Sequence, residues 1–206
     1  MQRQPARALL IDLDGVLRRW DPAVPAGVES SCGLPPGTLL ATAMSWDIYR
    51  PAMAGEITDE QWMGLIAERL PLPAERAAAA VAEWQTHRGY VDDEVLAFVR
   101  EVRAAGLPVG LATNATDRLR GDLTTLGLDG EFDEVLSSWE LKIHKPAPEF
   151  FEKARAALGL EAPWIMFVDD DDRAIRGARV AGMPALRWSD RRDFGYLRPA
   201  LGLRSS

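Results

Sequence analysis

Short apolar segments alternate with helical segments through most of this sequence, and that alternation constrains the fold more than any other feature. Each apolar segment is short and nearly uninterrupted, which is typical of a strand buried on both faces of a sheet. The five predicted strands are Ala6–Ile11, Pro108–Thr113, Glu134–Ser137, Trp164–Val168 and Pro184–Trp188. Because helical segments separate them, we predict an α/β fold with a doubly wound, five-stranded parallel sheet.

A long helical region separates the first two predicted strands. It contains three predicted helices, Val24–Cys32 ending at Gly33, Thr58–Leu70 opening with the capping box TDEQ, and Ala74–Trp84. We therefore predict that residues 22–90 form a helical cap inserted after the first strand. Residues 1–21 and 91–206 would form the α/β core domain.

The second part of the sequence supplies the helices expected between the later strands. Val95, Phe98, Val99 and Val102 have the spacing of one helix face, and Gly106 follows them. Further helices are predicted at Asp117–Leu126, Pro148–Leu158 and Arg173–Ala181, with a short helix after Arg191.

Composition excludes several classes of protein. A chain of 206 residues fits one to one and a half domains, and acidic residues outnumber basic ones by 31 to 24. No run of Lys or Arg exceeds two residues, so we expect no nucleic-acid partner. The apolar run near the start is broken at Asp12, and no later run reaches membrane-spanning length, so we expect a cytoplasmic protein with no membrane partner. The single cysteine, Cys32, cannot form an internal disulfide.

Polar side chains gather where predicted strands end. The stretch LLIDLDGVL places Asp12 and Asp14 after the first strand. The other candidates are Thr113 and Asn114 after the second strand, Lys145 in IHKPAP beyond the third, and Asp169 to Asp172 at the end of the fourth. Ligands of open parallel sheets bind at the carboxyl ends of the strands, so we expect these side chains to converge.

Converging carboxylates need a positive partner. Like charges in a poorly solvated cleft cannot all ionise unless a cation lies among them. Oxygen ligands with no cysteine or histidine beside them favour Mg²⁺, which is six-coordinate with metal–oxygen distances of about 2.1 Å. With the cation present, Lys145 and Thr113 could hold the oxygens of an anionic phosphate.

Each of these patterns also has a purely structural interpretation. The Asp12–Asp14 segment could be a turn, Thr113 and Asn114 could cap the next helix, and the aspartate run could be a solvated loop. Only their combination, in order and at successive strand ends, favours a phosphate and metal site.

The same residues resemble the motifs of the haloacid dehalogenase-like hydrolases, a superfamily made mostly of magnesium-dependent phosphatases. Asp12-Leu13-Asp14-Gly15-Val16 is similar to the first motif, Thr113-Asn114 to the second, Lys145-Pro146 to the third and Asp169-Asp170 to the fourth. The resemblance extends from about Arg7 to Trp188, and the helical insertion occupies the place of the C1-type cap of subfamily I. Met53–Trp62 also resembles cap sequence from a subgroup that includes small sugar-phosphate phosphatases.

The resemblance implies a role for each catalytic residue. Asp12 would attack phosphorus and form an aspartyl-phosphate, and Asp14 would protonate the leaving oxygen and then deprotonate water. Thr113, Lys145 and the backbone amide of Asn114 would hold the transferring phosphoryl group.

It also implies a magnesium site. Asp12, Asp170 and the backbone carbonyl of Asp14 would bind Mg²⁺ directly, and Asp169 would act through water. The sequence departs from the fourth motif at Asp171 and Ala174, where Ser and Asn are common in the family. The contacts that surround the metal ligands could therefore differ from those of other members.

Substrate selection would fall to the cap and to the segment after the first motif. Arg18 and Arg19 could reach an anionic substrate or could equally be solvated, and Arg50 is a candidate in the cap. We expect a phosphatase acting on a small phosphorylated metabolite, for example a sugar phosphate.

Three alternatives remain open. A phosphomutase or a dehalogenase would keep the fold and change the reaction, and a non-catalytic module would only bind a phosphorylated ligand. Asp14 favours phosphate over halide, because a departing halide needs no proton.

Overall fold

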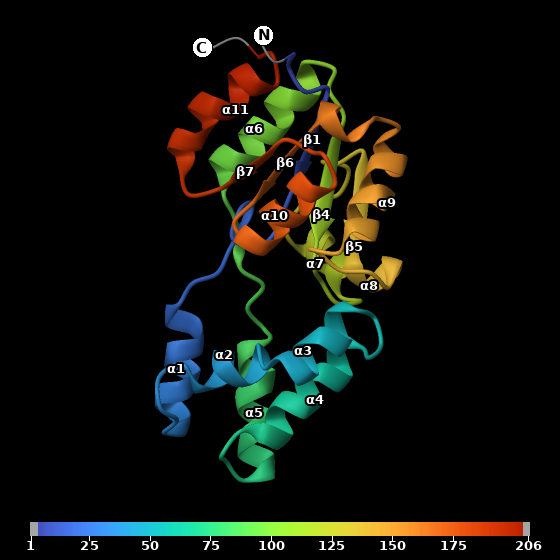
Figure 1. Ribbon diagram of the computed structural model, residues 1–206. Coiled ribbons are helices and arrows are strands. Elements are labelled where there is room, and N and C mark those ends of the chain that lie inside the picture. The colour runs from blue at the N-terminus through green and yellow to red at the C-terminus, as the bar shows by residue number, and fades with distance from the viewer. Residues whose placement is uncertain (1–3, 204–206) are drawn as a thin grey trace.

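The computed structural model describes residues 4–203 and contains the predicted parallel sheet (Figure 1). The strand order is β5-β4-β1-β6-β7, and all four pairings are parallel. The strands are β1 (Ala8–Ile11), β4 (Val109–Thr113), β5 (Glu134–Ser137), β6 (Ile165–Asp169) and β7 (Ala185–Arg187). The five predicted strands and the α/β fold class are therefore confirmed.

Helices cover both faces of this sheet. Those of the core are α6 (Asp93–Ala104), α7 (Leu119–Thr125), α8 (Ser138–Leu141), α9 (Pro148–Leu158), α10 (Asp172–Val180) and α11 (Phe194–Ala200), with 3₁₀ turns at Ala162–Trp164 and Arg191–Asp193. Helices α6, α7 and α11 pack on one face, and α9 and α10 pack on the other. Among residues 4–203, no helix is both long and apolar enough to cross a membrane.

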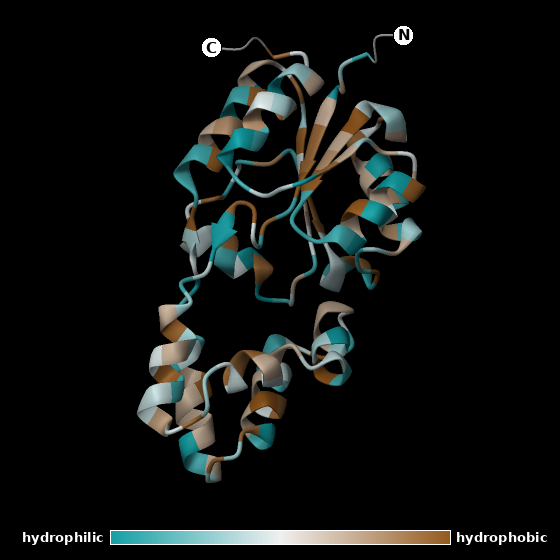
Figure 2. Cartoon of the chain, turned by 60° about the vertical axis from the view of Figure 1, so that its left-hand side comes forward, coloured by the Kyte–Doolittle hydropathy of each residue, from teal (hydrophilic) through white to brown (hydrophobic). Residues whose placement is uncertain are grey.

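Strand β1 shows why the central segments are apolar throughout. Leu9 and Ile11 point into the cluster formed with α6, α7 and α11, whereas Ala8 and Leu10 point into the cluster formed with α9 and α10. All four side chains are buried, because successive residues of a strand face opposite sides of the sheet. In Figure 2 the strands are accordingly coloured mostly brown and tan.

Five helices between Ala23 and Trp84 form a separate layer, which we call the cap. They are α1 (Ala23–Cys32), α2 (Thr38–Ala43), α3 (Trp46–Met53), α4 (Asp59–Arg69) and α5 (Ala74–Trp84). The cap has its own hydrophobic cluster, which includes Ile48, Trp62 and Ile66, and it lies below the sheet in Figure 1. The predicted capping box is present, with Thr58 accepting from the Gln61 amide and Gln61 accepting from the Thr58 amide.

The two segments that join the cap to the core pair with each other. Strand β2 (Arg18–Arg19) runs antiparallel to β3 (Tyr90–Val91). Sequence analysis missed this ladder, because two-residue strands carry no readable period. The pairing holds the outgoing and returning chain together beside the end of β1.

The order of the strands places their ends where a ligand site is expected. From the central β1 the chain proceeds to β4 and β5 on one side, and then to β6 and β7 on the other. The strand order thus reverses at β1, between β4 and β6. Such a reversal leaves a crevice at the carboxyl ends of the strands.

One glycine of α10 allows this helix to pack tightly against the segment that carries Lys145. A Cβ atom at Gly177 would lie 2.6 Å from the carbonyl oxygen of Pro146 and 2.9 Å from the ring of Phe151. We expect Gly177→Ala to lower the free energy of unfolding by about 1–3 kcal/mol, because backbone and a packed ring must move. Chemical denaturation of both proteins would measure this loss.

Gly121→Ala in α7 is the matched control. A Cβ atom there meets nothing within 4 Å, so this variant should be up to about 1 kcal/mol more stable than the parent. Equal effects of the two substitutions would contradict the tight packing at Gly177.

Candidate active site

A buried ion cluster lies at the carboxyl end of the sheet. The Nζ atom of Lys145 is 2.8 Å from Oδ1 of Asp12 and 2.6 Å from Oδ2 of Asp169. Asp12 follows β1 directly, and Asp169 ends β6, the strand paired with β1. The three residues are only 7%, 5% and 1% exposed for Asp12, Lys145 and Asp169. The tertiary fold therefore brings together three of the predicted site residues.

Burial and charge act in opposite directions in this cluster. Burial raises the pKa of Asp12 well above its usual 3.8; Lys145 opposes the rise, and the neighbouring carboxylate of Asp169 adds to it. For Lys145, burial alone would lower the pKa, but Asp12 and Asp169 together raise it above its usual value. Lys145 is thus held in its charged form. Its single positive charge does not balance the negative charge of the carboxylates in the cluster.

Asn114 and Thr113 connect β4 to this cluster. The Asn114 side chain donates to the carbonyl oxygen of Lys145 (3.0 Å) and accepts from the Lys145 amide (2.8 Å), which fixes the backbone that carries the ammonium group. Thr113 ends β4, and its buried Oγ1 has no hydrogen-bond partner within residues 4–203. A buried hydroxyl without a partner is costly, so Oγ1 is available to a ligand.

Three carboxylates could hold a cation. Oxygens of Asp12, Asp169 and Asp170 all lie within 4.8 Å of one another. Gly15 makes this approach possible: it has a φ of +81°, and a Cβ atom there would lie 2.0 Å from Oδ2 of Asp170. The glycine that follows the two aspartates is therefore required both by its backbone conformation and by the carboxylate beside it.

Asp14 is held by residues of the joining segment. Its Oδ1 accepts from Arg18 Nε (2.7 Å) and Trp20 Nε1 (2.6 Å), and its Oδ2 accepts from Arg18 Nη2 (2.8 Å). Arg18 also donates from Nη1 to Asp122 of α7 (2.9 Å). The solvated interpretation of Arg18 is thus wrong: the side chain is buried, and its contacts orient Asp14.

A cavity of about 890 Å³ opens over these groups. Its walls come from both the core and the cap, and the cap side is mainly apolar, with Leu40, Met44, Tyr49 and Trp84 among the lining residues. Arg50, the other predicted substrate residue, is placed elsewhere. It is absent from the walls of this cavity and forms an ion pair with Glu56 (2.5 Å).

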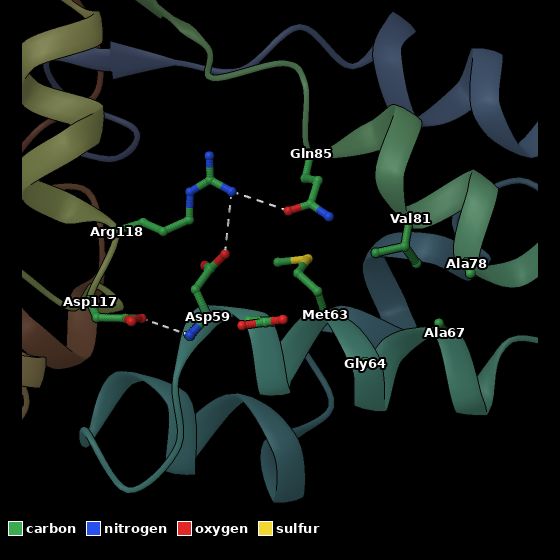
Figure 3. Close-up of a pocket in the computed structure, with 10 residues that line it drawn as sticks. Asp59, Met63, Gly64, Ala67, Ala78, Val81, Gln85, Asp117 and Arg118 are labelled. Atoms are coloured by element: carbon green, nitrogen blue, oxygen red, sulfur yellow. Dashed lines mark hydrogen bonds and ion pairs between the residues drawn. The ribbon is translucent and has the colours of Figure 1, made fainter.

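Polar contacts hold the cap against the core near the cavity (Figure 3). The amide of Asp59, at the start of α4, donates to Asp117 (2.7 Å), and the Asp59 carboxylate lies 3.6 Å from Arg118. Arg118 also donates to Gln85 at the end of α5 (3.1 Å). Two cap helices are therefore tied to the segment between β4 and α7.

Sequence analysis did not identify Asp122 or Asp59 as members of the site region. Both are single carboxylates on helices, and neither lies at a strand end. Apart from the charges themselves, no local pattern marked them, because their partners lie far away in the sequence.

The comparisons with known proteins agree with this fold. A family model described as haloacid dehalogenase-like hydrolase matches residues 6–182, so the chain belongs to this family. The chain is 34% identical over 143 residues to the phosphoserine phosphatase of Thermus thermophilus, a match covering 68% of this chain and 57% of the relative. It is 29% identical over 198 residues to the phosphoglycolate phosphatase of Yersinia pestis, covering 87% and 79%.

A solved structure shares the architecture. The crystal structure of a HAD family enzyme from Bacteroides thetaiotaomicron superposes with a TM-score of 0.74 at 20% identity, covering 94% of this chain and 98% of that one. At this identity the match supports the fold.

The raised pKa of Asp12 predicts a pH dependence of stability in metal-free buffer. The folded chain binds the Asp12 proton more tightly than the unfolded chain does, so stability is lost as the pH rises from about 4 through the folded pKa. Asp12→Asn does not titrate. The free energy of unfolding of Asp12→Asn minus that of the parent should therefore increase by up to about 1.4 kcal/mol per pH unit as the pH rises through this range.

Denaturant titrations of both proteins between pH 4 and pH 8 with a chelator would measure the difference. A difference that is constant or shrinks with increasing pH would show that Lys145 outweighs burial at Asp12.

Proposed function

We propose that this protein is a magnesium-dependent phosphatase that hydrolyses a small phosphorylated metabolite through an aspartyl-phosphate. The observation that carries the proposal is the position of Asp12, which is buried, paired with Lys145 and close to the carboxylate of Asp170. With a cation bound among these carboxylates, Asp12 would be ionised and would be a suitable nucleophile for phosphorus.

The relatives support this reaction class. The two curated relatives described above are named phosphoserine phosphatase and phosphoglycolate phosphatase, and both names refer to small phosphorylated acids. Because the chain spans only 57% of the first relative, its own substrate is inferred from its site.

The donor set fits Mg²⁺. Asp12 and Asp170 would bind the ion directly together with the backbone carbonyl of Asp14. Both oxygens of Asp169 already have protein partners, Lys145 Nζ and the Asp171 amide, which supports contact through water. When bound, Mg²⁺ would offset the excess negative charge of the carboxylates and polarise a phosphate oxygen. Ala174 is buried at the cavity wall and offers no polar atom to this set.

The phosphate would be held by groups at the ends of the strands. Lys145 would neutralise one phosphoryl oxygen, and the unpartnered Oγ1 of Thr113 would donate to another, with the backbone amide of Asn114 assisting. These donors are fixed before the substrate binds, because Asn114 ties the Lys145 backbone in place.

Asp14 would transfer protons in both steps. In the first step it must hold a proton and give it to the leaving oxygen, which requires the release of at least one of its contacts with Arg18 or Trp20. In the second step the ionised carboxylate takes a proton from the water that attacks the aspartyl-phosphate. Arg18, which Asp122 holds in place, would keep this carboxylate oriented.

Hydrolysis of an aryl phosphate by the purified protein tests the proposal. We expect activity with Mg²⁺, none with a chelator, and a loss of more than about 10³-fold in Asp12→Asn, because the nucleophile is removed. A panel of phosphorylated metabolites would be tested in parallel, since the cap could exclude aryl groups. Failure of the whole panel, or full activity of Asp12→Asn, would refute the proposal.

Gly15→Ala tests the metal site separately. The added Cβ atom would displace the Asp170 carboxylate, so we expect the affinity for Mg²⁺, measured by calorimetry, to fall by about 10- to 100-fold. Gly33→Ala is the matched control: Gly33 also has a positive φ, +70°, but a Cβ atom there meets nothing within 4 Å. It should lose stability and retain the metal affinity.

A further inference from the structure

Arg88, a residue that lines the cavity, carries a buried donor with no hydrogen-bond partner in the described part of the chain. The residue lies on the segment that returns from α5 to the core and lines the cavity above the ion cluster. Its side chain is 15% exposed, and its Nη2 atom is buried with no hydrogen-bond partner among residues 4–203. Buried polar groups of native proteins nearly always have partners, so this atom requires an explanation.

The neighbouring carboxylate does not supply the missing partner. Oδ1 of Asp122 lies 3.8 Å from Nε of Arg88, which is beyond hydrogen-bond distance, and Oδ2 of Asp122 accepts from Arg18. Asp122 is thus shared among three guanidinium groups, those of Arg18, Arg88 and Arg118, and it is Arg18 that donates a hydrogen bond to it.

The charge of Arg88 is incompletely balanced. Burial lowers the pKa of its guanidinium; Asp122 and Asp59 oppose this, while the positive charges of Arg118 and Arg18 lower the pKa further. A buried guanidinium in this situation is stabilised by an added anion.

The other cationic side chains of the cavity wall differ from Arg88. Lys145 contacts two carboxylates, and Arg18 donates to both Asp14 and Asp122. A residue that only braced the joining segment would be expected to direct its donors to the core, as Arg18 does. Arg88 instead leaves a donor without a partner beside a cavity large enough for a small organic molecule.

We propose that Arg88 binds a second anionic group, a carboxylate or a second phosphate, on the leaving group of the substrate. This inference rests on the proposed phosphatase function and narrows its substrate class to phosphate monoesters that carry another negative charge. Arginine suits the role, because its planar guanidinium pairs with either oxyanion through charged hydrogen bonds. The apolar residues of the cap side limit competition from water and would strengthen the pair.

A series of matched substrates tests the proposal. Carboxylates bearing a terminal phosphate, two to six carbons long, would be compared with alkyl phosphates of the same length and with the corresponding bisphosphates. At the best length, kcat/KM should be about 10- to 100-fold higher for one of the series with a second anionic group than for the alkyl phosphates. The series that is preferred identifies the second group as a carboxylate or a phosphate. Equal values at every length would overturn the proposal.

Two variants assign the preference to Arg88. In Arg88→Gln the ratio of the kcat/KM value for the substrate with a second anionic group to that for the alkyl phosphate should fall to nearly one. Arg100→Gln removes the same charge from an exposed side chain paired with Glu131 and should leave the ratio unchanged. An unchanged ratio in Arg88→Gln would show that a group other than Arg88 binds the second anionic group, and it would overturn the proposal.

Binding measurements separate this inference from the proposed reaction. Calorimetry with Asp12→Asn and with Asp12→Asn/Arg88→Gln, both with Mg²⁺, measures affinity for the two substrate series without turnover. Tighter binding of the anionic series that depends on Arg88 would support the subsite even if hydrolysis fails. Hydrolysis without any preference in rate or affinity would leave the phosphatase proposal standing and refute the subsite.

Discussion

The ammonium group of Lys145 lies between the carboxylates of Asp12 and Asp169, and the acidic end of the sheet depends on this contact. Two buried carboxylates at the ends of neighbouring strands would otherwise repel each other in a poorly solvated place. Much of the surrounding structure keeps the lysine there. Asn114 bonds its backbone on both sides, and the absence of a side chain at Gly177 lets α10 pack against Pro146.

This one lysine balances only part of the negative charge, and the remainder explains the chemistry that we propose. Burial leaves Asp12 with a raised pKa, and Asp170 approaches it across Gly15. A divalent cation would complete the balance, and a phosphate could then enter beside carboxylates that would repel it alone. The second aspartate, Asp14, is held apart from this cluster by Arg18, which allows the two carboxylates to perform different tasks.

Charge compensation also distinguishes the cap side of the cavity from the core side. The core cations are paired, and the aromatic and aliphatic side chains of the cap exclude water above them. Arg88 lies where the two parts meet, and none of residues 4–203 accepts a hydrogen bond from its buried Nη2 atom. The joining segments therefore do more than connect two layers, because β2 supplies Arg18 and the chain just before β3 supplies Arg88.

The sequence by itself determined the parallel sheet, the helical insertion and the set of polar residues at the ends of the strands, because hydrophobic period, capping residues and strand ends are local features. Asp12, Lys145 and Asp169 could be identified in this way. Only the tertiary structure decided that Arg18 is buried against Asp14, that Arg50 pairs with Glu56 outside the cavity, and that Nη2 of Arg88 has no hydrogen-bond partner in the described part of the chain. The sequence does not distinguish an arginine that is solvated from one that is paired or one that binds a ligand. The partner of an arginine depends on contacts between segments that are distant in the sequence.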